Sequence, residues 1–316
     1  MNNWLQWVTV QSPITCDCNH SIKMSTNTID SLTNQIRNNP NNSQLYLERG
    51  QAYFENGDFD KSIADFTQTI QLSPNNYTAY SKRAKVYMET GDYDKVIQDC
   101  SEVIQNIQQN QTSELFSAFF MRGVSHIIQQ DPKKAINDFT MSINTIKEED
   151  GTEEVYIYRG SAYEMLGEKQ CALEDYSRAI ELNPSSTSGY SSRGFIHVEN
   201  GHFELALGDF TKLIELDSND ELSYLKRANV YMLSKQNDLA EQDFKRAIEL
   251  NPQNYESFKQ FGSFYESIEN FEHALKCYDN AQSLSPGVAT EEIRNLKKKM
   301  KSNGGLWDYV SGWFSK

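Results

Sequence analysis

Two consecutive stretches of 34 residues decide the fold of this chain, because both repeat one pattern of apolar and small residues. Residues 187–220 read TSGYSSRGFIHVENGHFELALGDFTKLIELDSND, and residues 221–254 read ELSYLKRANVYMLSKQNDLAEQDFKRAIELNPQN. In both stretches the fourth residue is Tyr, the eighth is small and the twenty-fourth is Phe. Apolar residues spaced by three, four and seven positions predict two amphipathic helices in each stretch.

The same period extends along most of the chain. Pro40 and Pro74 are 34 residues apart, and the prolines near the ends of later units follow the same spacing. The middle of the chain fits this period if insertions are placed at 111–115 and 150–152. Seven full units then cover 43–288, and such a period indicates an array of stacked units. The units begin at Ser43, Tyr77, Phe116, Glu153, Thr187, Glu221 and Tyr255.

The seven units share several further positions. Their fourth residue is always aromatic, their eighth is Gly or Ala, and their eleventh is Tyr or His. A mostly small residue and, four positions later, a mostly aromatic residue follow in the second half, as in Ala206 and Phe210. With this pattern the units resemble tetratricopeptide repeats. The resemblance implies an all-α fold: a right-handed α-solenoid, or superhelix, of seven helix-turn-helix repeats with capping helices. It also implies a concave wall built mainly from the first helix of each repeat.

A helix is predicted to cover each end of the array, because the last repeats of a solenoid need polar outer faces. The N-terminal segment 1–42 is expected to be flexible apart from a half-repeat helix at 26–38. At the other end, 289–301 is predicted to form a solvating helix. The apolar faces of these helices hold Ile29, Leu32 and Ile36 in the first, and Ile293, Leu296 and Met300 in the second.

The last segment, 302–316, is an aromatic amphipathic tail behind a basic run. We expect a short helix there, and three roles for it stay open: a frayed or self-docked end, an anchor in a partner's or its own groove, or contact with an anionic membrane. The residues concerned are Lys297, Lys298, Lys299, Lys301, Leu306, Trp307, Tyr309, Val310, Trp313 and Phe314.

A charged residue pair recurs in the first six units. Position 7 is Arg and position 23 is Asp, whereas the seventh unit has Phe261 and Cys277 at these positions. This joint change predicts a partly buried ion pair within each unit, because removing one partner alone is costly. An alternating charged recognition surface is the other interpretation. The pairs are Arg49 and Asp65, Arg83 and Asp99, Arg122 and Asp138, Arg159 and Asp175, Arg193 and Asp209, and Arg227 and Asp243.

The third and fourth units are unusually apolar at the positions that the family directs toward its groove. Something is expected to cover this face. One interpretation is that the helix 102–111 extends and folds over it; the other is that a partner helix, or this chain's own N- or C-terminal aromatic segment, binds there. The predicted groove residues are Phe120, Met121, Val124, Ile127, Ile128, Ile157, Tyr158 and Met165.

Some members of the family bind the C-terminal carboxylate of chaperones through a clamp of Lys, Asn and Arg side chains. This chain lacks the residues of that clamp. The clamp positions of the first three units hold Leu47, Gln51, Lys82, Ser117 and Met121, none of which matches, and Lys226 is the one basic candidate elsewhere.

The predicted function is a non-catalytic interaction scaffold or adaptor that binds a peptide or helix of a partner protein around repeats 3–4. The alternatives are a membrane-peripheral adaptor recruited by the tail and a co-chaperone-like adaptor without a clamp.

Composition excludes several other classes. With 30 Lys and Arg against 44 Asp and Glu, the formal net charge of −14 argues against a nucleic-acid partner. No apolar stretch has the roughly 18 residues of a membrane-spanning helix. Five cysteines, mostly far apart, indicate a reducing compartment, and we expect a cytoplasmic protein. The oligomeric state stays open.

The sequence lacks the usual motifs for catalysis and cofactor binding. Cys16, Cys18 and His20 lack the further ligands of a structural zinc site, so no metal site is predicted. Neither a Gly-rich phosphate loop nor a Gly-x-Ser-x-Gly turn occurs. His126 and His197 stand where other units have Tyr and are expected to be packing residues. We therefore expect no enzyme activity, no catalytic residues and no cofactor.

Overall fold

The computed structural model describes residues 26–107, 112–145 and 153–302, and within these ranges every regular element is an α-helix. The chain divides into two compact units, with the boundary between Gly167 and Glu168. The all-α repeat fold predicted from the sequence is confirmed. The predicted helix within 302–316, apart from Ser302, lies outside the described residues, as does the N-terminal segment before Thr26.

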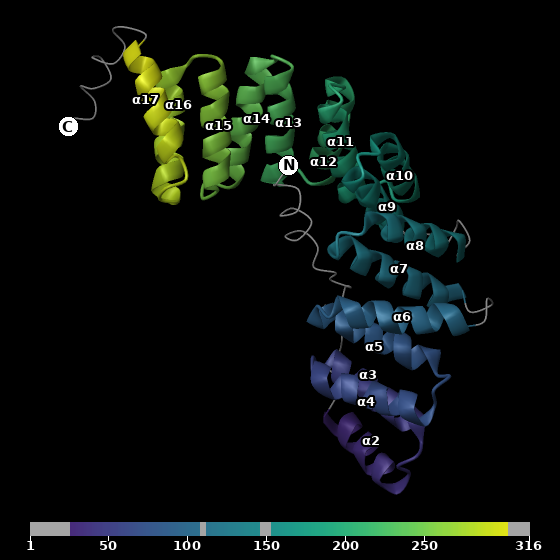
Figure 1. Ribbon diagram of the computed structural model, residues 1–316. Coiled ribbons are helices and arrows are strands. Elements are labelled where there is room, and N and C mark those ends of the chain that lie inside the picture. The colour runs from purple at the N-terminus through teal and green to yellow at the C-terminus, as the bar shows by residue number, and fades with distance from the viewer. Residues whose placement is uncertain (1–25, 108–111, 146–152, 303–316) are drawn as a thin grey trace. The chain divides into compact units, whose positions relative to one another are not determined.

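The first unit contains a single helix followed by helices in antiparallel pairs (Figure 1). Each first helix packs on the second helix of its own repeat, and that second helix packs on the first helix of the next repeat. The helices are α2 (Thr26–Asn38), α3 (Ser43–Glu55), α4 (Phe59–Leu72), α5 (Tyr77–Thr90), α6 (Tyr93–Asn106), α7 (Thr112–Ile128), α8 (Pro132–Thr145) and α9 (Glu153–Met165).

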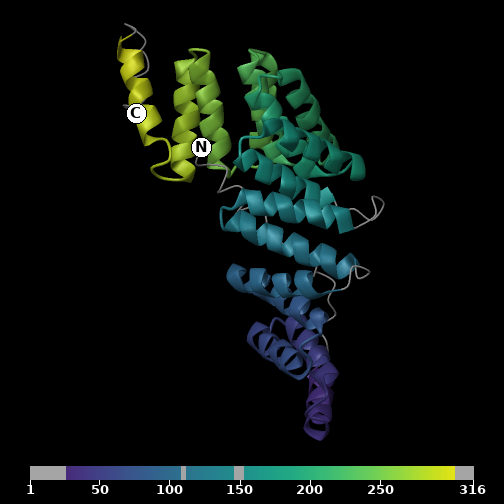
Figure 2. The same ribbon diagram turned by 45° about the vertical axis from the view of Figure 1, so that its right-hand side comes forward.

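The second unit has the same packing scheme within itself, and it extends from the second helix of repeat 4 to a final single helix. Figure 2 shows its last helix pair and the final helix, in yellow-green and yellow, from a second direction. The helices are α10 (Lys169–Leu182), α11 (Thr187–Glu199), α12 (Phe203–Leu216), α13 (Glu221–Leu233), α14 (Asn237–Leu250), α15 (Tyr255–Ser267), α16 (Phe271–Leu284) and α17 (Thr290–Ser302).

Short polar residues fix where the helices begin. Asn42, Asn76, Ser186, Asp220 and Asn254 precede first helices, and the side chain of each accepts a hydrogen bond from a backbone N–H of the first turn. These bonds satisfy donors that have no partner within the helix. The turn between the two helices of a repeat needs a residue with a left-handed backbone conformation. Gly57 and Gly91 adopt this conformation, with φ angles of 80° and 77°.

The small eighth residue of a repeat lets the two helices of that repeat approach closely. In repeat 5, a Cβ added at Gly194 would lie 2.6 Å from Cε1 of Phe210, whose side chain is 1% exposed. The equivalent Cβ at Gly123 would lie 2.7 Å from Phe139. The aromatic ring of the second helix therefore fills the space that the missing side chain leaves, which explains the paired sequence positions.

The insertion at 111–115 lengthens α7 rather than α6. The interpretation in which 102–111 extends and folds over the apolar face is wrong for the described residues: α6 ends at Asn106, and Ile107 is extended. The inserted residues from Thr112 onward add a turn to the beginning of α7. Leu115 in this turn is 8% exposed and packs with Val103 and Ile107 of the preceding segment.

Helices α2 and α17 bury their apolar faces against the neighbouring repeats. Leu32 and Ile36 of α2 pack with Leu45 of α3. At the other end, Leu296 and Met300 of α17 are fully buried against repeat 7. Each single helix therefore covers apolar surface that a further repeat would cover in a longer array.

Candidate partner-binding surface

In five repeats the arginine and aspartate side chains at positions 7 and 23 form bidentate ion pairs. In repeat 2, Nε and Nη2 of Arg83 donate to the two carboxylate oxygens of Asp99 at 2.9 and 2.8 Å. The side chains are 16% and 3% exposed. The same geometry occurs in four other repeats, with shortest N···O distances of 2.7 Å in Arg49–Asp65, 2.8 Å in Arg122–Asp138, 2.7 Å in Arg193–Asp209 and 2.7 Å in Arg227–Asp243.

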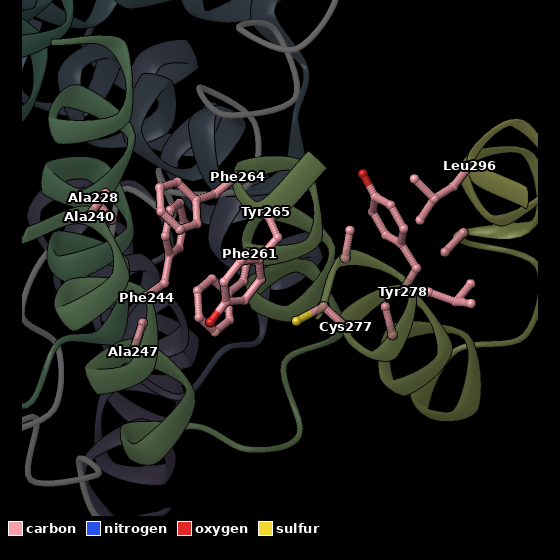
Figure 3. Close-up of a cluster of buried hydrophobic side chains, with 14 of the residues drawn as sticks. Ala228, Ala240, Phe244, Ala247, Phe261, Phe264, Tyr265, Cys277, Tyr278 and Leu296 are labelled. Carbon is pink, nitrogen blue, oxygen red and sulfur yellow. The ribbon is translucent and has the colours of Figure 1, made fainter. Parts of the chain in front are cut away.

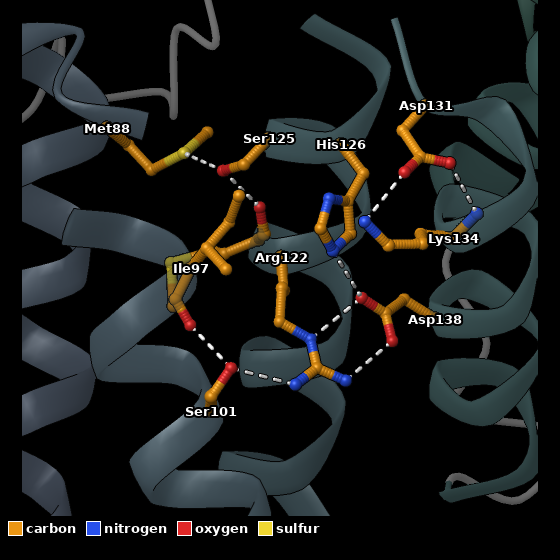
Figure 4. A network of polar contacts seen from close by, with 10 residues as sticks. Met88, Ile97, Ser101, Arg122, Ser125, His126, Asp131, Lys134 and Asp138 are labelled. Atoms are coloured by element: carbon orange, nitrogen blue, oxygen red, sulfur yellow. Dashed lines mark hydrogen bonds and ion pairs between the residues drawn. The ribbon is translucent and has the colours of Figure 1, made fainter. Parts of the chain in front are cut away.

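Each of these arginines also reaches the preceding repeat, a contact that the sequence analysis missed. Nη1 of Arg83 donates to Oγ1 of Thr67 on α4 at 2.9 Å, and Nη1 of Arg122 donates to Oγ of Ser101 at 2.9 Å (Figure 4). Arg159 likewise donates to Thr140 at 3.1 Å. The further donor and acceptor pairs are Arg49 with Thr33, Arg193 with Ser177, and Arg227 with Thr211.

A sequence signal for this contact exists. A Ser or Thr stands 16 residues before Arg49, Arg83, Arg193 and Arg227, and the distance grows only where an insertion intervenes. Where Phe261 replaces the arginine, the residue 16 positions earlier is Lys245. The hydroxyl, the arginine and the aspartate therefore change together. The guanidinium joins three helices of two repeats, and its geometry is that of a structural bridge.

Repeat 7 replaces the ion pair by aromatic packing (Figure 3). Phe261 is 6% exposed, and its ring centroid lies 4.4 Å from that of Tyr265 and 5.4 Å from that of Phe244. Cys277 is buried in the same cluster. Buried ion pairs can be exchanged for well-packed apolar residues at little cost, so the last repeat needs no charge at these positions.

The apolar residues predicted to line the groove divide into two groups. Val124 and Ile127 of α7 are 3% and 6% exposed and belong to the core cluster that joins α7, α8 and α9. They therefore form the floor under the surface rather than the surface itself. A charge introduced at Ile127 would disrupt α7 and would not report on binding alone.

The remaining groove residues are accessible on α7 and α9, the first helices of repeats 3 and 4. The rings of Phe120 and Tyr158 meet edge to face with centroids 5.5 Å apart. Both are partly exposed, and Ile128 is 42% exposed. We call Phe120, Met121, Ile128, Ile157, Tyr158 and Met165 the inner apolar surface; all except Ile128 are partly buried.

The predicted tail site divides at the end of the described residues. Lys298, Lys299 and Lys301 are exposed on α17, Lys297 is partly buried, and Lys299 forms an ion pair with Glu266 of α15. The aromatic part of the prediction lies outside the described residues: Leu306, Trp307, Tyr309, Val310, Trp313 and Phe314.

His126 is buried and His197 is partly buried, as expected for residues that stand where other repeats have Tyr. Burial lowers the pKa of His126, against the opposing effect of Asp138, and burial also lowers the pKa of His197. Cys100 and Cys277 are buried free thiols, and burial raises the pKa of Cys277 to about 12. Such a thiol is a poor nucleophile at neutral pH.

No group of three or more His, Cys, Asp or Glu side chains that could hold a metal ion occurs among the described residues. No helix in this part of the chain has the length and apolar character needed to cross a membrane.

Comparisons with known proteins agree with this architecture. The family model described as TPR repeat matches residues 50–91, and the one described as tetratricopeptide repeat matches residues 222–254. None of the curated proteins matches the sequence. Among solved structures, the C-terminal part of a TPR repeat-containing protein from Cytophaga hutchinsonii is 18% identical with a TM-score of 0.65, over 79% of this chain and 98% of that chain.

A second similar structure is a tetratricopeptide repeat protein from Parabacteroides merdae. It is 18% identical with a TM-score of 0.57, and the match covers 80% of this chain and 96% of that chain. At this identity the likeness shows the fold alone. The matched repeat models, the residue pattern of seven units and the paired helices together place the chain in one family: it is a tetratricopeptide repeat protein.

Proposed function

We propose that this chain is a non-catalytic, cytoplasmic scaffold that binds a peptide or helix of a partner protein on the inner apolar surface of repeats 3 and 4. Tetratricopeptide repeats indicate a protein–protein interaction scaffold, which supports this proposal. The supporting observation is the accessible aromatic pair Phe120 and Tyr158; Ile128 and Ile157 lie on the same two helices. The free thiols of Cys100 and Cys277 suit a reducing compartment.

The inner apolar surface can supply part of the binding free energy of a reversible complex. Complete burial of one large apolar side chain contributes about 1.5–3 kcal/mol relative to an exposed one. Three of these partly exposed residues would contribute a fraction of that amount each, on the order of 3–5 kcal/mol together before the entropy of binding is subtracted. Side chains contributed by the partner would have to add the rest, because micromolar affinity corresponds to a net binding free energy of about 8 kcal/mol.

The test uses two residues of repeat 3 that are almost equally exposed. Ile128 on α7 belongs to the inner apolar surface and is 42% exposed, whereas Met141 on α8 is 41% exposed and lies outside it. Peptides would be selected from a displayed library of random 16-residue sequences on the wild-type protein. The affinity of one selected peptide would then be measured by fluorescence anisotropy for wild type, Ile128→Glu, Ile157→Glu and Met141→Glu.

The proposal predicts that Ile128→Glu and Ile157→Glu weaken binding at least tenfold while Met141→Glu leaves it unchanged. Circular dichroism of all three variants controls for folding. Equal binding by all variants, or a loss only in Met141→Glu, contradicts the proposed surface.

Recruitment to an anionic membrane is a second proposal, supported by the orientation of α17. This helix buries Leu296 and Met300 against the array, while Lys298 and Lys301 are exposed. Sedimentation with vesicles that contain phosphatidylserine would test it. We expect binding that is lost on deletion of 303–316 and in high salt. Equal sedimentation of the deleted chain would contradict this role.

A further inference from the structure

Two lysines on α5 lie next to the inner apolar surface. Nζ of Lys82 donates a hydrogen bond of 2.7 Å to Oε1 of Gln51 on α3. Nζ of Lys85, one turn later, lies 5.9 Å from the ring centroid of Phe54, also on α3. Both ammonium groups therefore lie on the side of α5 that faces the preceding first helix.

The lysines and the apolar residues belong to one continuous face of first helices. Met88, one turn beyond Lys85 on α5, packs in the core cluster that also includes Phe120 and Tyr158. Oγ of Ser125 on α7 lies 3.5 Å from Sδ of Met88. A peptide that covers Phe120 and Tyr158 and continues toward α3 would therefore pass the two lysines.

Lys82 is a partly buried cation on α5. No carboxylate oxygen of the described residues is paired with its Nζ within 4.0 Å. By contrast, the more exposed Lys61 and Lys95 each form an ion pair with an aspartate three residues earlier. The hydrogen-bond partner of Lys82 is a neutral amide, whose own Nε2 donates to Glu55 at 2.8 Å.

The surroundings disfavour the charge on Lys82. Burial lowers the pKa of its ammonium group, the positive charge of Lys85 lowers it further, and Glu55 opposes both effects. A partly desolvated ammonium group beside a second cation gains from an additional anion. A carboxylate is suitable, because it can accept hydrogen bonds from both lysines.

We propose that Lys82 and Lys85 bind an aspartate or glutamate side chain of the partner peptide, next to the apolar residues that occupy the inner apolar surface. The partner is then an amphipathic acidic peptide. This inference rests on the proposed binding surface and adds the charge of its ligand. Because the whole chain has a formal net charge of −14, the preference arises from short-range pairing with these two lysines.

The test compares two double variants that change the net charge equally. Lys82→Gln with Lys85→Gln removes the proposed site, whereas Lys61→Gln with Lys95→Gln removes two lysines on second helices. The displayed random 16-residue library is selected on wild type and on both variants. One acidic peptide from the wild-type selection is then synthesised with its carboxylates and with each Asp or Glu replaced by Asn or Gln.

We expect acidic residues beside apolar ones to be enriched on wild type and on the control variant, but not on Lys82→Gln with Lys85→Gln. The amide peptide should bind wild type about tenfold more weakly than the acidic peptide, and this difference should vanish in that variant. Amide and acidic peptides that bind wild type equally would overturn the inference, as would an equal loss in the control variant.

The two proposals fail in different ways. If apolar peptides bind and Ile128→Glu still abolishes binding, but acidic residues bring no advantage, the inner apolar surface stands and only the carboxylate site is refuted. If wild type selects no peptide, or if Ile128→Glu has no effect on a selected peptide, the surface itself is refuted, and the carboxylate site with it.

Discussion

The bridge centred on Arg83 makes a graded prediction about stability. Asp99→Ala leaves a guanidinium that is 16% exposed without its carboxylate, and removal of one partner from a buried pair costs about 3–5 kcal/mol. Thr67→Val removes a single hydrogen bond to the same charged group. Because the guanidinium retains some contact with water, we expect the lower end of the range for such bonds, about 1.5 kcal/mol.

A third variant tests the physical cause. Repeat 7 carries Phe261 and Cys277 at the two positions of the ion pair. Arg83→Phe combined with Asp99→Cys introduces the two residues of repeat 7 into repeat 2. The free energy of unfolding of this double variant should lie within about 1 kcal/mol of wild type, because apolar replacement of a whole buried ion pair is close to neutral. The double variant should thus be more stable than Asp99→Ala alone.

The assay must resolve individual repeats, since arrays need not unfold in one step. Hydrogen exchange measured by mass spectrometry gives the free energy of opening of α5 and α6, and urea unfolding gives the stability of the chain. The predicted order of destabilisation is Asp99→Ala, then Thr67→Val, then the double variant. The reasoning is refuted if the double variant is as unstable as Asp99→Ala, or if Asp99→Ala costs less than Thr67→Val.

Three further predictions concern packing and pH. Gly194→Val should destabilise repeat 5 by about 1–3 kcal/mol, because even a Cβ would lie 2.6 Å from Phe210; an unchanged urea midpoint would contradict this. Leu296→Ala should cost about 2–5 kcal/mol and speed exchange in repeat 7, because Leu296 is fully buried, whereas the exposed Lys298→Ala should do neither. His126→Tyr should reduce the loss of stability between pH 7 and pH 5. Burial lowers the pKa of His126 in the folded chain, whereas the imidazole of the unfolded chain has a pKa of about 6.5. The unfolded chain therefore binds more protons as pH falls, and the stability of wild type decreases. Equal pH profiles for wild type and His126→Tyr would contradict that assignment.

The sequence predicted the repeat fold well because its signals are local. Predicted unit starts such as Ser43, Thr187 and Tyr255 are the first residues of α3, α11 and α15. The start of each of these units is fixed by two local signals: an N-cap residue before the first helix, and a small residue opposite an aromatic ring. The Arg–Asp pairs were predictable for the same reason, since both partners lie within one repeat.

The features that the sequence did not predict depend on contacts between helices, which the 34-residue period does not specify. An insertion between two helices can lengthen either one, and only the burial of Leu115 against Val103 and Ile107 explains why α7 grew. Val124 and Ile127 fit the family's groove positions, but the packing of α8 and α9 covers them. The hydroxyl of Thr67 belongs to a different repeat from Arg83, so their contact requires the stacking of repeats to be known.

The most direct test of the central claim places a photo-reactive residue on each of two equally accessible positions. p-Benzoylphenylalanine would replace Ile128 in one protein and Met141 in another, and each would be irradiated in source cells and analysed by mass spectrometry. The account predicts that position 128 becomes linked to a segment of a partner protein that combines apolar and acidic residues, and that position 141 does not. Links to that partner at position 141 alone, or the same partner segment linked at both positions, would contradict it.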